Sequence, residues 1–364
     1  MSGFAVRSHW SRPEPAVRAL RASLCITALA GAAAVVATVW GGQFSGPRQD
    51  VELAPPGPGR PLPVAAFAPP AADVFSAAQA LELPGGWVVL DGRGQQLVFL
   101  DPGGRVVRRV SGPGEGPGEL SRAVGLARVD STLVTVDETG ETLNHFGTDG
   151  AFLGRVRVPP ADCAIGAVRE VLSDAEGLVL LRTCTRGDGS TSARVERVSL
   201  AGDVHLLAER RYNVLGRGRL DPARFPVLAA PGGRIYLGVA PDRCVSLVGA
   251  EDAPRLCHPE TSPPPLPDSV VREFRKIELR LRALGADVVV PERYPPFDQI
   301  LALNGQLAFR VVLGEGRWAL DVHQGDALAR LLPPAGVRVL PGSRSLLLAR
   351  ELLEGTAFAV VRLP

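Results

Sequence analysis

The sequence lacks a strong charge of either sign and contains almost no lysine. Forty Lys and Arg residues against 38 Asp and Glu residues leave a formal net charge of +2. Proteins that bind nucleic acids through their phosphates need a basic excess, so no nucleic-acid partner is expected. Lys276 is the only lysine. Because arginine replaces lysine in every segment rather than on one face, we interpret this as coding bias.

Motifs of common catalytic and metal sites are also missing. No G-x-S-x-G nucleophile elbow occurs, and no Ser can be paired with a His and an Asp from the sequence. The five histidines form no H-x-x-x-H pair; they are His9, His145, His205, His258 and His323. The sequence therefore predicts no catalytic residue, no metal ligand and no cofactor, although histidines of separate units could still converge in space.

Long apolar runs are absent apart from residues 22–40, which read ASLCITALAGAAAVVATVW. This uncharged stretch is just long enough to cross a bilayer as a helix. Arginines precede it within residues 1–21, so the positive-inside rule places that segment in the cytoplasm and the rest of the chain outside. We expect an anchor in the inner membrane with the bulk of the protein in the periplasm, or a secreted protein if the helix is a cleaved signal peptide.

Residues 41–70 are rich in proline and are expected to form an extended, hydrated linker. The end of this segment, residues 63–67, could instead add a strand to the domain that follows. That domain, residues 71–364, has the apolar content needed for a large core, since 46% of the chain is hydrophobic. The 41 Gly and 33 Pro residues suit short strands joined by tight turns.

A repeat organises residues 71–364. Residues 85–110 align with residues 131–158 as strand, polar turn, strand, Gly turn and strand. Four looser units follow, which makes six; their equivalent positions are Asp91, Asp137, Arg182, Val239, Val311 and Arg350. A period of about 40–50 residues with three or four short strands is typical of a β-propeller blade. The fold class is therefore all-β, with a six-bladed propeller favoured over a pair of β-sandwiches.

The sixth unit has two clear strands and is shorter than a complete blade. A strand from residues 63–80 could complete it and close the ring, which would remove exposed sheet edges.

Residues 111–120, SGPGEGPGEL, directly follow the first unit and contain Gly112, Gly114, Gly116, Pro117, Gly118 and Glu119. This segment resembles the G-x-G-x-G-P-G-E-[FL] loop of a bacterial six-bladed β-propeller family related in architecture to NHL-repeat and TolB-type propellers. The resemblance covers about residues 75–364 and implies an exported propeller. A phosphate-binding interpretation fails, because the alternating glycines fit neither nucleotide template and two prolines remove N–H donors. We interpret the loop as a turn between blades.

Three residues are candidates for ligand binding. Asp91 and Asp137 end equivalent strands, where carboxylates either cap turns or line one rim of the ring. His145 occupies a strand position in the second unit.

Four cysteines outside the apolar run suggest disulfides in an exported protein. Cys244 and Cys257 flank a hairpin of the fourth unit, and Cys163 and Cys184 flank the turn at residues 173–177. We expect pairing within each unit, with free buried thiols as the alternative.

An insertion at residues 267–285, PDSVVREFRKIELRLRALG, has apolar residues at helical spacing. Asp268 is the expected N-cap and Gly285 the expected end. This helix is predicted to pack on the propeller rim with its charged face in water, or to act as a partner-binding or lid element.

The favoured function is an exported, membrane-tethered binding module that engages a protein, peptide or small molecule at one face of the ring. An alternative is an exported propeller enzyme, of the lyase or hydrolase type, with its site at the central channel. A purely structural envelope component is the third possibility.

Overall fold

The computed structural model describes residues 50–363 except for 65, 188–189, 215–218, 221–224, 251, 260–261, 283–286, 315–316 and 343–344. The predicted cytoplasmic segment 1–21 and the predicted membrane helix 22–40 lie outside the described residues. Among the residues that are described, no helix has the length and apolar character required to span a membrane.

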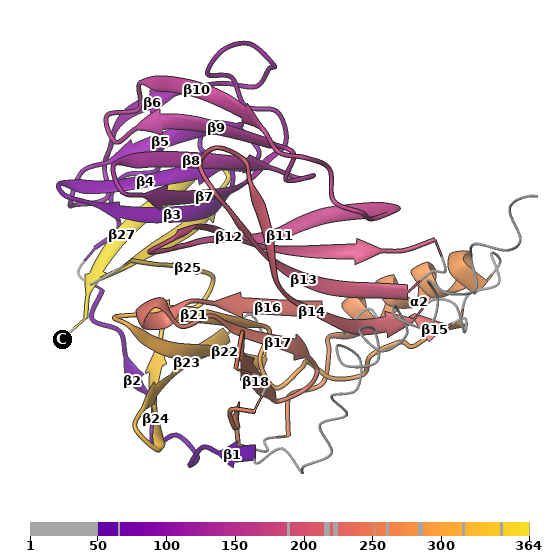
Figure 1. The fold of residues 1–364 in the computed structure, drawn as a ribbon. Coiled ribbons are helices and arrows are strands. Elements are labelled where there is room, and N and C mark those ends of the chain that lie inside the picture. The colour runs from indigo at the N-terminus through magenta and orange to yellow at the C-terminus, as the bar shows by residue number, and fades with distance from the viewer. Residues whose placement is uncertain are drawn as a thin grey trace, which may run out of the picture. The chain divides into compact units, whose positions relative to one another are not determined.

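The described residues form six β-sheets that follow one another along the chain (Figure 1). The first contains β3 (Ala77–Leu83), β4 (Gly86–Asp91), β5 (Gln96–Leu100) and β6 (Val106–Val110), and the second contains β7 (Ala123–Val129), β8 (Thr132–Asp137), β9 (Thr142–Gly147) and β10 (Phe152–Arg157). The third contains β11 (Ile165–Asp174), β12 (Gly177–Thr185), β13 (Ser190–Val198) and β14 (Val204–Val214), and is extended by β15 (Arg219–Leu220) and β20 (Asp287–Val288).

The second half of the chain supplies the other three sheets. The fourth contains β16 (Phe225–Ala229), a 3₁₀ turn η2 (Pro231–Gly233), β17 (Tyr236–Ala240), β18 (Cys244–Leu247) and β19 (Arg255–Cys257). The fifth contains β21 (Gln299–Leu303), β22 (Gln306–Gly314), β23 (Arg317–Gln324) and β24 (Ala327–Leu332). The sixth has three strands, β25 (Arg338–Pro341), β26 (Ser345–Leu352) and β27 (Gly355–Arg362).

These sheets close into a ring. The first strand of each sheet contacts the first strand of the next, from β3 through β7, β11, β16 and β21 to β25, and β25 contacts β3. A hydrophobic cluster fills the space between every pair of neighbouring sheets, including the pair formed by the last and the first. Each sheet is thus a blade, and the fold is a six-bladed β-propeller, as the repeat predicted.

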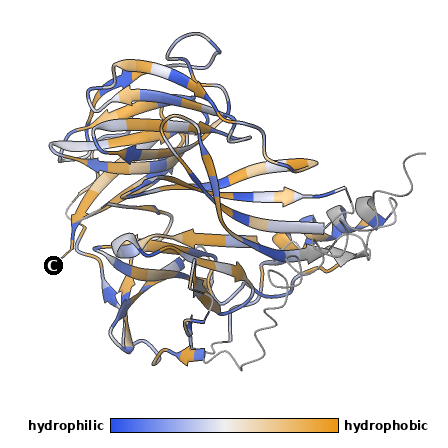
Figure 2. Ribbon diagram, viewed as in Figure 1, coloured by the Kyte–Doolittle hydropathy of each residue, from blue (hydrophilic) through white to orange (hydrophobic). Residues whose placement is uncertain are grey.

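The repeat positions identified in the sequence fall on equivalent strands. Asp91, Asp137, Arg182, Val239, Val311 and Arg350 lie on β4, β8, β12, β17, β22 and β26, the second strand of each blade. These strands are sandwiched between two neighbouring blades, so both of their faces are buried; eight of the nine residues of β12, for example, are buried. Figure 2 shows hydrophobic residues running along the blade strands. Burial on both faces explains why the second strands read as short apolar runs.

The segment predicted as a hydrated linker is extended, but its described part lies on the outer edges of three blades. We call residues 50–74 the strap. Its first strand, β1 (Asp50–Glu52), pairs in parallel with β19 of the fourth blade, and its second, β2 (Arg60–Pro61), pairs in parallel with β24 of the fifth (Figure 1). Ala71 then exchanges two backbone hydrogen bonds with Thr356 of the sixth blade.

The strap therefore supports the short sixth blade, as expected for residues 63–80, although as a single bridge rather than a full strand. Apolar side chains bury it at three positions. Leu53 enters the cluster between the fourth and fifth blades, Leu62 the next cluster, and Val74 the cluster between the sixth and first blades. Burial of each leucine contributes roughly 1.5–3 kcal/mol, which explains why a proline-rich segment stays docked.

The insertion forms α2 (Asp268–Arg282), as predicted, while the expected end at Gly285 lies outside the described residues. The helix contacts β20, which pairs with β15 at the edge of the third blade. In the sequence the insertion lies between the fourth and fifth blades. Its strand β20 nevertheless pairs at the edge of the third blade.

Candidate functional site

A cavity of about 710 Å³ lies within the ring, lined by the first strand of all six blades. It is the central channel of the propeller. Apolar side chains such as Ala80 and Leu126 contribute part of its wall. Seven charged residues also line the cavity: Glu82, Arg128, Arg169, Glu170, Asp298, Arg310 and Arg338.

The channel wall consists of strand edges, because the first strands of neighbouring blades belong to different sheets. Their backbone groups therefore need partners from side chains. Gln79 of the first blade provides two: its amide accepts from Leu126 N–H of the second blade at 2.8 Å and donates to Val171 C=O of the third at 2.6 Å. A glycine is needed at position 125, since a Cβ there would collide with the Val171 side chain.

Glu170 supplies the next bridge and is the most perturbed acid of the channel. Its carboxyl group accepts a hydrogen bond of 3.3 Å from Leu228 N–H of the fourth blade. Burial raises the pKa of Glu170 to about 8, and the hydrogen bond from Leu228 opposes this rise only in part. Its carboxyl is therefore mainly protonated and uncharged at neutral pH.

The cations of the channel differ in how their charge is balanced. Arg310 makes a two-pronged ion pair with Asp298, at 2.7 and 2.9 Å. Arg338 donates to Ala77 C=O at 2.9 Å and lies 3.5 Å from a carboxylate outside the channel. Arg128 and Arg169 are exposed, and within the part of the chain that the structure describes neither forms an ion pair.

Arg169 also affects the pKa of Tyr212. Burial raises the pKa of Tyr212, and the positive charge of Arg169 offsets part of that rise. With Glu170 uncharged, four arginines face two carboxylates in the channel. The channel thus carries net positive charge, with Arg128 and Arg169 available to an incoming anion.

The predicted ligand-binding candidates lie elsewhere. Asp91 is fully buried, and its carboxylate accepts hydrogen bonds of 3.0–3.3 Å from the N–H groups of Phe75, Ser76, Arg93 and Gly94. Asp137 accepts from Glu141 N–H at 2.9 Å and from Thr142 N–H at 3.2 Å. Both carboxylates stabilise the turn after the second strand of their blade. Neither lines the channel.

His145 lies on β9 and is half-buried. Burial lowers the pKa of its imidazole, whose Nε2 has no hydrogen-bond partner among the described residues. No histidine occurs among the described residues that line the channel, so the convergence that the sequence left open is not found there.

The glycine loop is a turn between blades, as interpreted from the sequence. Glu119 Oε2 accepts a hydrogen bond of 2.8 Å from Gly116 N–H, and Gly118 adopts a positive φ of +78°. Arg155 of β10 donates to the carbonyl oxygens of Glu115 and Gly116 at 2.8 and 2.9 Å. These contacts hold the loop against the second blade.

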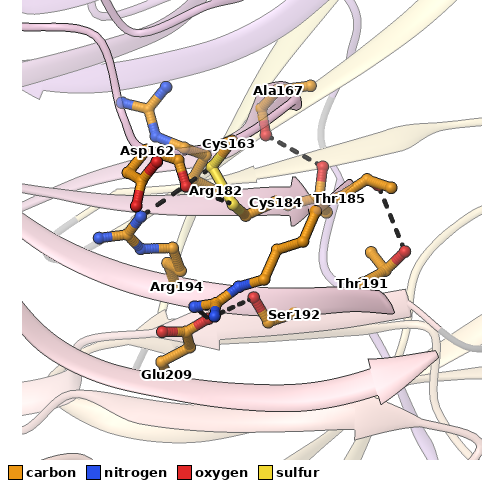
Figure 3. Close-up of a disulfide and its surroundings, with 12 residues drawn as sticks. Asp162, Cys163, Ala167, Arg182, Cys184, Thr185, Thr191, Ser192, Arg194 and Glu209 are labelled. Atoms are coloured by element: carbon orange, nitrogen blue, oxygen red, sulfur yellow. Dashed lines mark hydrogen bonds and ion pairs between the residues drawn. A yellow bond between two sulfur atoms is a disulfide. The ribbon is translucent and has the colours of Figure 1, made fainter. Parts of the chain in front are cut away.

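Both predicted disulfides are present. Cys244 and Cys257 are directly paired across β18 and β19, with a Cα–Cα distance of 4.0 Å. Figure 3 shows the other disulfide, which joins Cys163, before β11, to Cys184 of β12. Asp50 lies near the first pair, but because both thiols are oxidised this group offers no thiolate ligands for a metal.

One buried polar cluster was missed by the sequence interpretation. His258 Nε2–H donates to Asp321 Oδ2 at 2.9 Å, and Arg330 donates twice to the same carboxylate at 2.7 Å. Burial alone would raise the pKa of Asp321, but the hydrogen bonds from Arg330 and His258 lower it. The His258 ring also packs on Phe309 at 5.3 Å between the fourth and fifth blades. His258 and Asp321 are fully buried and Arg330 is about one-fifth exposed, so we interpret the cluster as structural.

Comparison with known proteins shows no matching family model and no matching curated protein. Solved structures do match. An exported protein of Bacteroides fragilis is 11% identical over 87% of this chain and 100% of its own, with a TM-score of 0.49. The calcium-binding protein regucalcin of Agrobacterium tumefaciens is 15% identical over 84% and 97%, with a TM-score of 0.48.

A third match is the PQQ-bound aldose sugar dehydrogenase of Streptomyces coelicolor, which is 13% identical over 85% of this chain and 99% of its own, with a TM-score of 0.43. These similarities are too distant to carry a function to this chain. The assignment of the propeller rests on its own six sheets and their closed ring.

Proposed function

We propose that this propeller is an extracytoplasmic binding module whose ligand is a small anionic molecule held in the central channel. The observation that carries the proposal is the pair Arg128 and Arg169, exposed in the channel and without an ion-pair partner among the described residues. Guanidinium groups recognise carboxylates and phosphates through paired, charge-assisted hydrogen bonds.

The size and polarity of the channel support this assignment. Its volume of about 710 Å³ falls in the range of small-molecule sites, about 300–1,000 Å³. Since Glu170 is mainly uncharged at neutral pH, it does not cancel the free cations. It would offer a hydrogen-bond donor to the ligand instead.

The two disulfides support an oxidising compartment outside the cytoplasm. A membrane anchor at residues 22–40, or its removal as a signal peptide, stays a prediction from the sequence.

The alternative function, an exported enzyme of the lyase or hydrolase type, is favoured by one observation. A carboxyl with a pKa of about 8 in a cavity can serve as a general acid near neutral pH. Under this alternative, substitution of Glu170 by glutamine abolishes turnover and leaves ligand affinity nearly unchanged.

The test begins with native mass spectrometry of the full-length protein in detergent, which reports any ligand that copurifies. Thermal unfolding is then followed with phosphate, succinate and citrate, and with glucose as a neutral comparison. We expect at least one anion to raise the Tm, and Arg169→Gln or Arg128→Gln to abolish the effect. Arg362→Gln is the matched control, because Arg362 is an exposed arginine on β27 outside the channel.

Stabilisation by glucose alone, or an anion effect that survives both channel substitutions, would contradict the proposal.

A further inference from the structure

The chain covers the outer edges of four blades with its own residues. β1 and β2 add to the fourth and fifth blades, the strap bridges to the sixth, and β15 with β20 extends the third. In the first and second blades the outermost described strands are β6 and β10. Their outward backbone groups are the sheet edges that the described chain leaves without a strand.

β6 is an open edge with an unbalanced positive charge. Its side chains include Arg108 and Arg109, Arg105 directly precedes it, and all three are exposed. Among the described residues none of them forms an ion pair: Arg108 lies over the Phe99 ring at 4.4 Å, and Arg109 donates to a carbonyl oxygen of the strap. Val107, which precedes Arg108, is 64% exposed.

A groove of about 550 Å³ lies between the first half of this strand and the turn that joins β3 to β4. Its walls include Phe99 of β5, Val107 and Arg108 of β6, and Thr148 from a turn of the second blade. The groove offers an apolar floor for an apolar side chain, while Arg109, on the opposite face of β6, can pair with a carboxylate at the adjacent position of an added strand.

The fourth blade shows how this chain occupies such an edge. β1 has the sequence Asp50-Val51-Glu52, in which carboxylates alternate with an apolar residue. It pairs with the blade as an added strand, while Arg255 binds Asp50 at 2.6 Å and Arg243 binds Glu52. An acidic extended segment on an arginine-bearing edge is therefore a mode of association already present in the molecule.

We propose that β6 and its groove bind an extended segment of a partner protein in which acidic and apolar residues alternate. The segment adds to the first blade as a further strand. Its acidic side chains lie on the face of the blade that carries Arg109 and pair with that residue. Its apolar side chains lie on the opposite face, where one enters the groove beside Phe99 and Arg108. This surface is separate from the channel, so the interaction does not depend on the proposed channel ligand.

The second open edge, β10, is less suited to such a partner. Arg155 holds the glycine loop through backbone carbonyl groups, and Arg157 donates to the Thr142 hydroxyl at 2.9 Å. Its arginines are thus already engaged within the second blade, whereas those of β6 face solvent without carboxylates.

The test uses the full-length protein and a blocked seven-residue peptide in which valine alternates with aspartate or glutamate. We expect saturable binding by fluorescence anisotropy, and we expect Arg108→Glu combined with Arg109→Glu to weaken the Kd about tenfold or more. Arg362→Glu, which reverses one exposed charge on β27, is the control and should bind as the wild type does. Both variants must keep the wild-type Tm.

Hydrogen exchange then locates the peptide. Strand addition protects the amides of residues 106–110, and a peptide with a central proline, which cannot complete the ladder, should lose both binding and protection. Undiminished binding by the doubly reversed variant, protection confined to other strands, or absence of binding would each overturn the proposal.

Discussion

Replacing Glu170 by glutamine should remove a pH dependence of stability that the wild-type channel imposes. In the unfolded chain this carboxyl has its ordinary pKa of 4.5, whereas burial raises its pKa in the folded protein to about 8. Between these two values the folded state holds one more proton than the unfolded state. The wild type is therefore most stable below the lower value and loses stability as the pH rises toward the upper one.

The magnitude follows from the linkage relation. One proton of difference changes the free energy of unfolding by about 1.4 kcal/mol per pH unit. Because the Glu170 side chain faces the channel and is only partly shielded from water, we take about half of that slope. From pH 5.5 to pH 7.5 the wild type should lose about 1.5 kcal/mol relative to Glu170→Gln.

The assay is equilibrium unfolding in urea at pH 5.5, 6.5 and 7.5 for the wild type, Glu170→Gln and a control, Glu354→Gln. Glu354 is an exposed residue in the turn between β26 and β27. We expect the two stability curves of wild type and Glu170→Gln to meet at acid pH and to separate as the pH rises, with the variant more stable. A constant difference across the three pH values, or a wild type that gains on the variant toward pH 7.5, would refute the reasoning.

Three further substitutions test the parts that hold the ring together. Leu62→Ala should lower the free energy of unfolding by about 3 kcal/mol, since it leaves a cavity where the strap packs between the fifth and sixth blades. Urea unfolding measures this loss, and a loss below 1 kcal/mol would mean that the strap is not held by Leu62. Glu196→Gln leaves the buried guanidinium of Arg182, which it contacts at 3.0 Å, without its carboxylate; a loss of about 3 kcal/mol is expected in the same assay, and a neutral effect would contradict the burial of this pair. Replacing Cys163 and Cys184 by serine together opens a loop of 21 residues, for which chain entropy predicts a loss of about 3 kcal/mol; an unchanged Tm under oxidising conditions would count against that disulfide.

The blades and disulfides could be predicted because their signals are local in sequence. Each blade is a run of hairpins, so its strands and turns lie within one repeat. Cys244 and Cys257 face each other across a single hairpin, which places them in register without any distant information. Helix α2 was predictable for the same reason, from the spacing of its own apolar residues.

The docking of β1 and β2 and the charged lining of the channel could not be predicted, because both are made by residues far apart in the chain. Leu53 and Leu62 are isolated apolar residues in a proline-rich segment, and nothing nearby indicates the clusters that bury them. Glu170 lies in a strand of ordinary polar and apolar residues. Its raised pKa comes from burial in the channel, and the partner of its carboxyl group, Leu228 N–H, lies 58 residues later. Asp91 and Asp137 were predicted as ligand-binding candidates because they recur at equivalent positions, but they recur because each stabilises the same turn of its blade.

The strap also sets the order in which the molecule can be completed during synthesis. The strap is synthesised before the propeller, but its partners come much later in the chain. Asp50 binds Arg255, 205 residues later, and Val74 C=O accepts a hydrogen bond from the Thr356 hydroxyl, 282 residues later. The strap therefore cannot dock along its full length until nearly the whole chain exists. Such distant pairing slows folding, and in a protein exported from its N-terminus it would keep the arriving chain open until translocation is almost finished. Loss of only the last strands would then also remove the partner of Ala71 and Val74 at the end of the strap.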